Sequence, residues 1–225
     1  MIVLAIDCAA NLCAACVYDA DAGRELGRKV VDLGKGHAEH LMTIIAEALG
    51  EGGVGYSDLD RIGVAIGPGS FTGLRVGVAT ARGLALALKV PAVGVTTLEA
   101  LAAEARQGFA GRAVLAALDG GRGEIHAALY DERAVLRHGP MVMTLDEAVR
   151  MATETMPVLA GTVANRIAEA AARRFDIGPL TPTADIATYA RLAASKAPGV
   201  SPKPVYLREA DAKPQAGFIL PRTGG

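Results

Sequence analysis

The chain has 225 residues, of which 51% are hydrophobic and 21% are charged, and its formal net charge is −1. Such an apolar composition excludes a disordered chain, while the lack of a basic excess and of tryptophan argues against a protein that grips nucleic acid by itself. No run approaches the roughly 18 apolar residues of a membrane helix and the N-terminus lacks a basic leader, so we expect a cytoplasmic protein without a membrane span.

In the first half of the chain, changes of apolar periodicity predict five strands and three helices. The strands are expected at 2–7, 12–19, about 25–32, 61–66 and 91–95, and the helices at about 37–49, 70–89 and 96–106. Cys13 and Cys16 are an odd number of residues apart on the second strand, so they point to opposite faces. We therefore expect these cysteines and Cys8 to be buried free thiols and not a metal site.

Two stretches far apart in the chain share one pattern. Residues 3–19 read VLAIDCAANLCAACVYD, and residues 114–131 read VLAALDGGRGEIHAALYD. Each contains an apolar strand that ends in an aspartate (Asp7 or Asp119), a turn of small residues, and a second strand that ends in Tyr-Asp. A strand, a helix, a strand and a helix follow the second stretch, at 134–143, from about 144, at 157–160 and at 163–175. The order βββαβα thus occurs twice, which predicts a duplicated α/β fold with a cleft between the two halves.

The duplication divides the chain into three predicted segments. We expect an N-terminal subdomain at 1–108, a C-terminal subdomain at 109–197 and a proline-rich, extended tail at 198–225. A last helix is expected over about 183–197, either within the second subdomain or packed back on the first half.

Five stretches, in this order, resemble a known family: VLAIDCAA, GPGSFTGLRVGVATARGLAL, VGVTTLEALA, LDGGRGEIHAALY and KPVYLR. The duplicated hairpins are similar to those of the actin, sugar-kinase and heat-shock-chaperone ATPase superfamily. Within it, the five stretches resemble the bacterial TsaB (YeaZ) family, glycoprotease-like proteins of tRNA threonylcarbamoyladenosine synthesis. The resemblance implies actin-like, ribonuclease-H-like subdomains whose hairpins face each other across the cleft.

The same resemblance implies a role more than a reaction. It implies a noncatalytic scaffold that heterodimerises with a TsaD-like catalytic subunit, which transfers a threonylcarbamoyl group to the tRNA adenine next to the anticodon. A TsaE-like ATPase is the third partner, tRNA is expected to bind only through the complex, and the chain alone is either a monomer or a homodimer. Two rival functions stay open: a small-molecule kinase or ATPase that uses the cleft, and a metallopeptidase.

The histidines at the start of the helix expected over 37–49 bear on a metal site. TsaD-like relatives hold their metal with a His-x3-His pair, whereas His37 and His40 are only three residues apart. Asp185 stands where those relatives place a ligating aspartate, but their neighbouring asparagine and glycine-rich context are missing. We therefore expect no bound metal and ordinary histidines in a solvated helical turn.

By the same resemblance, a nucleotide site would use Asp7 and Asp119 at the hairpins, and Gly161 and Asn165 in a stretch similar to the superfamily's adenosine loop. A helix N-terminus near Asn165 would offer free N–H groups to a ligand. Against this, the first turn reads CAAN and lacks the glycines that wrap a phosphate closely. The sequence thus leaves open a working ATPase and a vestigial site with weak ATP or ADP binding, and we expect no resident cofactor.

The glycine-rich stretch GPGSFTGLRVG, at 67–77, fits neither the P-loop nor the dinucleotide-binding pattern. Small residues recur at steps of three and four along the helix that follows it. Glycine inside a helix costs about 0.5–1 kcal/mol relative to alanine, so we expect close approach of another backbone. This is either the chain's own helix at 37–49 or a second chain, because the resemblance implies a helical bundle between TsaB and TsaD. The predicted partner interface comprises Gly73, Gly77, Thr80, Ala81 and Leu84 with Leu41 and Ile45.

Overall fold

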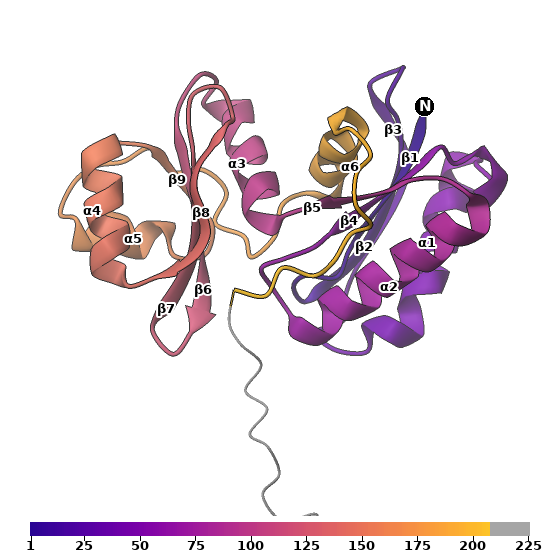
Figure 1. Cartoon of the computed structure of the whole chain (residues 1–225), viewed down its shortest axis with the longest axis horizontal. Coiled ribbons are helices and arrows are strands. Elements are labelled where there is room, and N and C mark those ends of the chain that lie inside the picture. Colours follow the sequence, from indigo (N-terminus) through magenta and orange to yellow (C-terminus); the bar gives the residue numbers. More distant parts are fainter. Residues whose placement is uncertain (208–225) are drawn as a thin grey trace, which may run out of the picture.

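The computed structural model describes residues 1–207, so the predicted tail beyond Leu207 lies outside the described residues. It contains two β-sheets with helices between and outside them (Figure 1). The first sheet, of order β3-β2-β1-β4-β5, contains β1 (Ile2–Asp7), β2 (Leu12–Asp19), β3 (Arg24–Asp32), β4 (Arg61–Ala65) and β5 (Ala92–Val95). The second sheet, of order β8-β7-β6-β9, contains β6 (Val114–Gly121), β7 (Glu124–Tyr130), β8 (Leu136–Met143) and β9 (Val158–Ala160).

The helices alternate with these strands along the chain. The α-helices of the described residues are α1 (His37–Gly52), α2 (Phe71–Leu88), α3 (Thr97–Gly108), α4 (Leu145–Thr155), α5 (Ala164–Ala170) and α6 (Ile186–Ser195), with a short 3-10 helix at Tyr56–Asp58. The helix predicted over 163–175 therefore extends five residues beyond the C-terminal end of α5. It stops because Ala172 adopts a positive φ of 50°, after which Ile177 bridges to Leu159 at the sheet edge.

The first four strands of the first sheet and the four strands of the second sheet have the same topology, whereas β5 has no counterpart in the second sheet. In each half the first two strands form an antiparallel hairpin, β1–β2 and β6–β7, and the first strand pairs in parallel with the fourth, β1–β4 and β6–β9. This repetition confirms the predicted α/β fold with duplicated βββαβα subdomains.

Burial on both faces explains why the first strand reads as an unbroken apolar run. Val3 and Ala5 face the central core between the two sheets, whereas Leu4 and Ile6 face the outer core under α1 and α2. The cysteines follow the same alternation, because Cys13 belongs to the outer core and Cys16 to the central one. All three cysteines are buried and free, as the sequence predicts.

Two helices fill the space between the sheets (Figure 1). α3 packs on β6 and its neighbours in the second sheet, although it precedes the predicted boundary at 108. α6 packs on β1, β4 and β2 of the first sheet, the second of the two placements that the sequence left open. The helix that follows the first half in sequence thus lies on the second sheet, and the last helix lies on the first. The central core contains residues from both halves.

The predicted partner interface needs correction, because the glycine face of α2 packs on this chain's own first sheet. A side-chain carbon built at Gly73 would lie 2.0 Å from the carbonyl oxygen of Cys8. One built at Gly77 would lie 3.6–3.7 Å from the side chains of Cys8 and Val64. The close approach expected from the glycines is real, but the neighbour is the end of β1, and neither α1 nor another chain.

Of the other five residues of that predicted interface, three are buried and two are only partly exposed. Ala81, Leu41 and Ile45 are buried in the outer core that α1 and α2 share with the sheet. Thr80 and Leu84 are only half-exposed, at the margin of the same face. Small residues on α2 therefore mark where the helix meets the sheet.

α2 is also the one described helix that is long and apolar enough, by length and composition alone, to cross a membrane. In this fold its apolar residues serve the outer core, where Leu74, Val78 and Ala85 are buried. The hydropathy of α2 thus has an explanation within the folded chain.

Gly73 and Gly77 of α2 should respond differently to alanine. Gly73→Ala should lower the free energy of unfolding by about 1–3 kcal/mol, because its methyl group would overlap a backbone carbonyl that cannot move aside. Gly77→Ala should be neutral or stabilising by up to about 1 kcal/mol, because the methyl group meets ordinary contacts and alanine favours the helix.

Chemical denaturation of both variants measures this difference. Gly83→Ala is the matched control, since nothing lies within 4 Å of the added carbon and only the gain in helix propensity applies. Equal losses at positions 73 and 77 would show that the helix does not approach β1 as described.

Candidate functional site

A cleft of about 530 Å³ opens where the two hairpins face each other. It lies at the carboxyl ends of the parallel strands of both sheets, the usual place for a ligand in α/β folds. Its lining residues are Ala9, Ala10, Asn11, Gly34, Pro68, Gly69, Ser70, Leu118, Asp119, Gly120, His126, Thr162 and Pro182. The predicted cleft is thus present, and the glycine-rich loop before α2 forms part of its wall.

Asp7, at the end of β1, lies beneath the first hairpin turn and does not line the cleft. Its side chain is buried, with a relative exposure of 1%. One carboxylate oxygen accepts a hydrogen bond from the Ala9 amide at 2.8 Å, and the other accepts one from the Thr183 hydroxyl at 2.6 Å. Both oxygens are therefore satisfied within the chain.

This contact continues into the central core. The hydroxyls of Thr183 and Tyr189 are 2.7 Å apart, and Tyr189, on α6, is fully buried. Burial raises the pKa of Asp7 to about 6, although the hydrogen bonds from Thr183 and Ala9 act in the opposite direction. The Asp7–Thr183–Tyr189 chain ties the first hairpin to the segment that leads into α6. The sequence offers no local signal for it, because 176 residues separate Asp7 from Thr183.

The second hairpin is arranged differently. Asp119 is exposed in the cleft, where its carboxylate accepts a hydrogen bond from the Gly121 amide at 2.8 Å. The Asp119 amide donates to the hydroxyl of Thr162 at 2.9 Å. Thr162 is one of the cleft residues that sequence reasoning missed, although its position next to Gly161 could have indicated it.

Gly161 and Asn165 do not line the cleft. Gly161 adopts a φ of +94°, and a side chain there would collide with the Ala117 carbonyl oxygen, so its role is a tight turn after β9. Asn165 is exposed on the first turn of α5. Of the four positions predicted for a nucleotide, the structure places one, Asp119, in the cleft.

The charge of the cleft does not favour a phosphate. Among the lining residues within 1–207, Asp119 is the one acidic side chain, and neither lysine nor arginine is present. A site that binds a nucleoside triphosphate needs cationic side chains or a bound metal to offset the negative charge of the phosphates. Nucleotide binding stays a prediction. The charge of this lining favours a vestigial site with weak ATP or ADP binding over a working ATPase.

The histidine turn is not as solvated as the sequence predicts. His40 is exposed, but His37 is buried, and its Nε2 lies 3.1 Å from the carbonyl oxygen of Ala10 in the first hairpin turn. Asp185 caps α6 and pairs with Arg28 of β3 at 2.8 Å. Within residues 1–207, no group of three histidine, cysteine, aspartate or glutamate side chains is arranged to hold a metal ion.

Asp7→Asn should remove a pH-dependent part of the stability. In the unfolded chain the Asp7 carboxyl ionises near pH 4. The folded protein keeps that proton up to about pH 6, so the contribution of Asp7 is greatest below pH 4 and is lost as the pH rises through 6. The free energy of unfolding of the wild type, minus that of Asp7→Asn, should therefore fall by roughly 2–3 kcal/mol between pH 4 and 6 and then level off.

Urea titrations at several pH values give this difference directly. Asp119→Asn, on the exposed second hairpin, is the matched control. A difference between wild type and Asp7→Asn that does not change with pH would show that Asp7 is not buried as described.

A family model described as "TsaD: tRNA N6-adenosine threonylcarbamoyltransferase" matches residues 32–181. The tRNA threonylcarbamoyladenosine biosynthesis protein TsaB of Escherichia coli is 33% identical over 140 residues, which cover 60% of this chain and 58% of that protein. The chain thus matches less than two thirds of the length of this relative. An uncharacterized protein of Mycobacterium tuberculosis is 32% identical over 216 residues, 95% of both chains.

Solved structures show the same relationship. The crystal structure of an uncharacterized protein with similarity to peptidase YEAZ from Pseudomonas aeruginosa superposes with a TM-score of 0.75 and 27% identity, over 92% of this chain and 99% of that one. An inorganic polyphosphate/ATP-glucomannokinase from Arthrobacter superposes with a TM-score of 0.51 and 15% identity, over 86% of this chain and 98% of that one, which shows a shared fold alone. From its sequence and its fold, the chain belongs to the glycoprotease-like TsaD family and, within it, to the TsaB (YeaZ) group.

Proposed function

We propose that this chain is a noncatalytic scaffold in tRNA threonylcarbamoyladenosine synthesis, where it heterodimerises with a TsaD-like subunit that carries out the transfer. Membership of the TsaB group supports the place in tRNA modification, because the relatives that bear this name are described as biosynthesis proteins of that nucleoside. A TsaE-like ATPase completes the proposed complex, tRNA binds through the assembled complex, and the proposed compartment is the cytoplasm.

The proposal that the chain is noncatalytic rests on the burial and surroundings of the two hairpin aspartates, Asp7 and Asp119. Asp7 is buried and bonded to Thr183 and Ala9, so it is not available to a ligand in the cleft. Asp119 is exposed, but the described residues that line the cleft around it include no lysine or arginine to hold phosphates. A working phosphoryl-transfer site needs an exposed carboxylate together with cations or a metal.

The rival functions have less support. The alternative of a small-molecule kinase is supported only by a fold shared with a sugar kinase, and a fold alone does not determine the reaction. A metallopeptidase would need a group of metal ligands, and among residues 1–207 no three histidine, cysteine, aspartate or glutamate side chains are arranged as one.

Reconstitution with purified components tests the proposal. This chain, a TsaD-like protein, a TsaE-like ATPase and a threonylcarbamoyl donor should together modify the tRNA, and leaving out this chain should abolish the modification. Asp119→Ala should retain full modification, because the proposed role does not use this carboxylate. Liquid chromatography of the digested tRNA measures the modified nucleoside.

The same proteins address the kinase alternative. ATP turnover by this chain alone that is lost in Asp119→Ala would overturn the noncatalytic assignment. The absence of any complex with the TsaD-like subunit would overturn the scaffold role.

A further inference from the structure

Two sulfur atoms face each other at the first hairpin turn, behind the wall of the cleft. The Sγ atoms of Cys8 and Cys13 are 3.8 Å apart, and both side chains are buried in the outer core. Cys8 directly follows β1 and Cys13 is the second residue of β2, so this pair lies one step beyond the opposed residues Asp7 and Ala14. The proposed scaffold role assigns these thiols no task.

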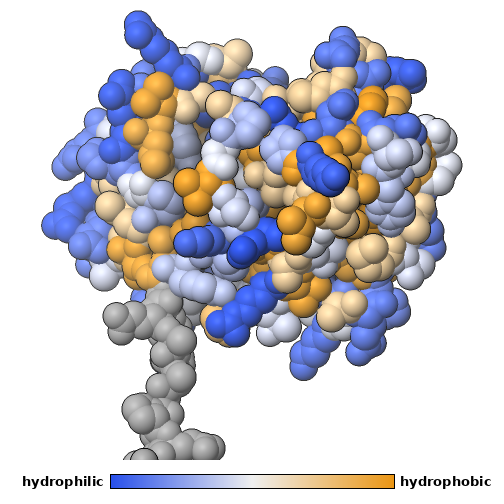
Figure 2. Space-filling model, turned by 45° about the vertical axis from the view of Figure 1, so that its right-hand side comes forward, coloured by the Kyte–Doolittle hydropathy of each residue, from blue (hydrophilic) through white to orange (hydrophobic). Residues whose placement is uncertain are grey.

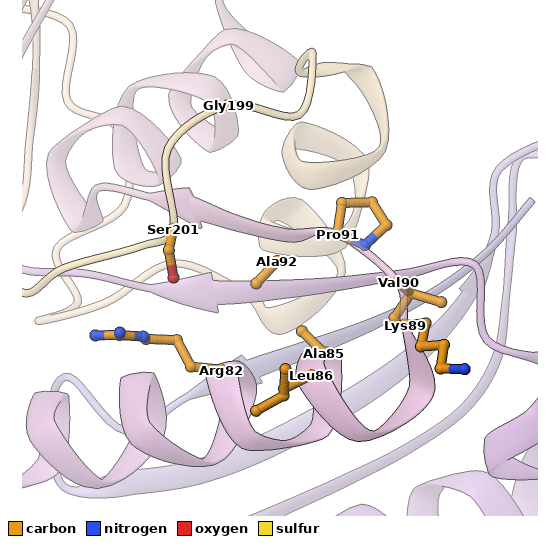
Figure 3. Close-up of a pocket in the computed structure, with 9 residues that line it drawn as sticks. All are labelled: Arg82, Ala85, Leu86, Lys89, Val90, Pro91, Ala92, Gly199 and Ser201. Atoms are coloured by element: carbon orange, nitrogen blue, oxygen red, sulfur yellow. The ribbon is translucent and has the colours of Figure 1, made fainter.

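The outer surface offers charge and apolar patches in place of such chemistry. On the side of the molecule that contains α1 and α2, apolar patches alternate with hydrophilic side chains (Figure 2). The hollow of about 400 Å³ beside the C-terminal half of α2 is lined, within the described residues, by no cysteine, histidine, aspartate or glutamate (Figure 3). A covalent reaction is therefore more readily placed at the thiol pair.

The position of the pair suits a disulfide bond. Residues directly opposite each other on antiparallel strands have Cα atoms about 4.5–5.5 Å apart, within the range of about 4.4–6.8 Å that a disulfide spans. The side chains of Cys8 and Cys13 lie on the same face of the sheet. Closing the bond requires the two Sγ atoms to approach from 3.8 Å to about 2.0 Å, with no change of face or register.

The third cysteine of the chain is excluded from this bond. Cys16 faces the central core, on the other side of the sheet, and its Sγ lies 3.5 Å from a carboxylate oxygen of Glu25. Since the sequence contains three cysteines, an internal disulfide is restricted to Cys8 and Cys13. Cys16 is therefore an internal control for the reactivity of the pair.

The bond would move one side of the turn more than the other. On the β1 side, α2 leaves no room, since a side-chain carbon at Gly73 would lie 2.0 Å from the Cys8 carbonyl oxygen. On the β2 side, the Asn11 carbonyl oxygen accepts hydrogen bonds from the amides of Leu33 and Gly34, each at 3.1 Å. Two hydrogen bonds give way more easily than packed backbone does, so the displacement falls on Asn11, which lines the cleft.

The two thiols are not equivalent. The hydrogen bond with Cys8 lowers the pKa of the Cys13 thiol, while burial acts in the opposite direction. The same hydrogen bond, together with burial, raises the pKa of Cys8. Because the thiolate is the nucleophile, Cys13 reacts first. Three of the four residues between the cysteines line the cleft, so a local opening of the turn admits a small, uncharged oxidant.

We propose that Cys8 and Cys13 form a reversible redox pair, which hydrogen peroxide converts to a disulfide across the first hairpin turn, and that this bond displaces the Asn11 side of the cleft wall. The inference is independent of the scaffold role. It assigns a modification site to the outer core and makes the shape of the cleft depend on the oxidation state of the chain.

The reaction has two steps. The Cys13 sulfur attacks one peroxide oxygen, the O–O bond breaks, and the leaving hydroxide takes the thiol proton to form water, so that Cys13 becomes a sulfenic acid. The Cys8 sulfur then attacks the Cys13 sulfur, the S–O bond breaks, and the hydroxide leaves with the Cys8 proton as a second water. Two thiols thus lose two electrons and two protons to one peroxide, and a dithiol reductant reverses the change.

Thiol mapping of the full-length chain tests the bond. The reduced wild type is treated with hydrogen peroxide under native conditions, then denatured and alkylated. Trypsin releases residues 1–24 as one peptide with all three cysteines, because Arg24 is the first basic residue. Mass spectrometry should find one alkyl group, on Cys16, and the loss of two hydrogen atoms elsewhere. Treatment with dithiothreitol before alkylation should restore three alkyl groups.

Three variants separate the roles of the cysteines. Cys16→Ala is the matched control and should still form the bond. Cys8→Ala should leave Cys13 as a sulfenic acid that dimedone captures, whereas Cys13→Ala should give neither a disulfide nor a dimedone adduct. The proposal is wrong if the native wild type keeps three alkylatable thiols, or if Cys16 is oxidised as readily as the pair. This mapping of the wild type holds even where a variant fails to fold.

Hydrogen exchange tests the movement of the cleft wall. In the oxidised chain the amides of Leu33 and Gly34 should exchange about tenfold faster than in the reduced chain, because their shared acceptor is displaced. The amide of Ser70, which donates to the Ala9 carbonyl oxygen on the fixed side, should keep its rate. Peroxide-treated Cys8→Ala with Cys13→Ala should show no change. Equal rates at positions 33 and 34 in both oxidation states would overturn the proposed displacement.

Discussion

The carboxylate of Asp7 has no access to water, so the folded protein must satisfy it, and part of that task falls to a segment far away in the sequence. The Thr183 hydroxyl supplies one hydrogen bond and is itself held by Tyr189 on α6. An unmatched carboxylate in this position would cost several kcal/mol, so the first hairpin and the approach to α6 depend on each other. This contact helps to position α6 over the first sheet, and with it the central core that unites the halves.

The cleft and the outer face of α2 differ in the charge of their side chains. The cleft lies at the carboxyl ends of the parallel strands, but Asp7 is buried beneath it, and the described residues that line it include neither lysine nor arginine. The cations instead occur on the outer face of α2, beside exposed apolar side chains.

Much of the fold could be predicted because its signals are local. The matched hairpins around Asp7 and Asp119 indicate the duplication, and the unbroken apolar run of β1 reflects burial on both faces. The predictions that failed concern which element a side chain contacts when that element is distant in the sequence. Gly73 indicates a close approach, but no local pattern tells whether the neighbour is β1, another helix or another protein. Likewise, His37 reads as a surface histidine until the fold places the Ala10 carbonyl beside it.

The placement of α3 and α6 has a consequence for how this chain folds during synthesis. The first sheet is complete once residue 95 has been made, yet the helix that covers its inner face ends at Ser195. Until then, the inner side chains of β1 and β2 lack their covering helix, so the first half cannot finish folding as an independent domain while the ribosome is still translating the second. Neither half is a self-sufficient unit, and the two should reach the native state in one cooperative step once α6 has been made.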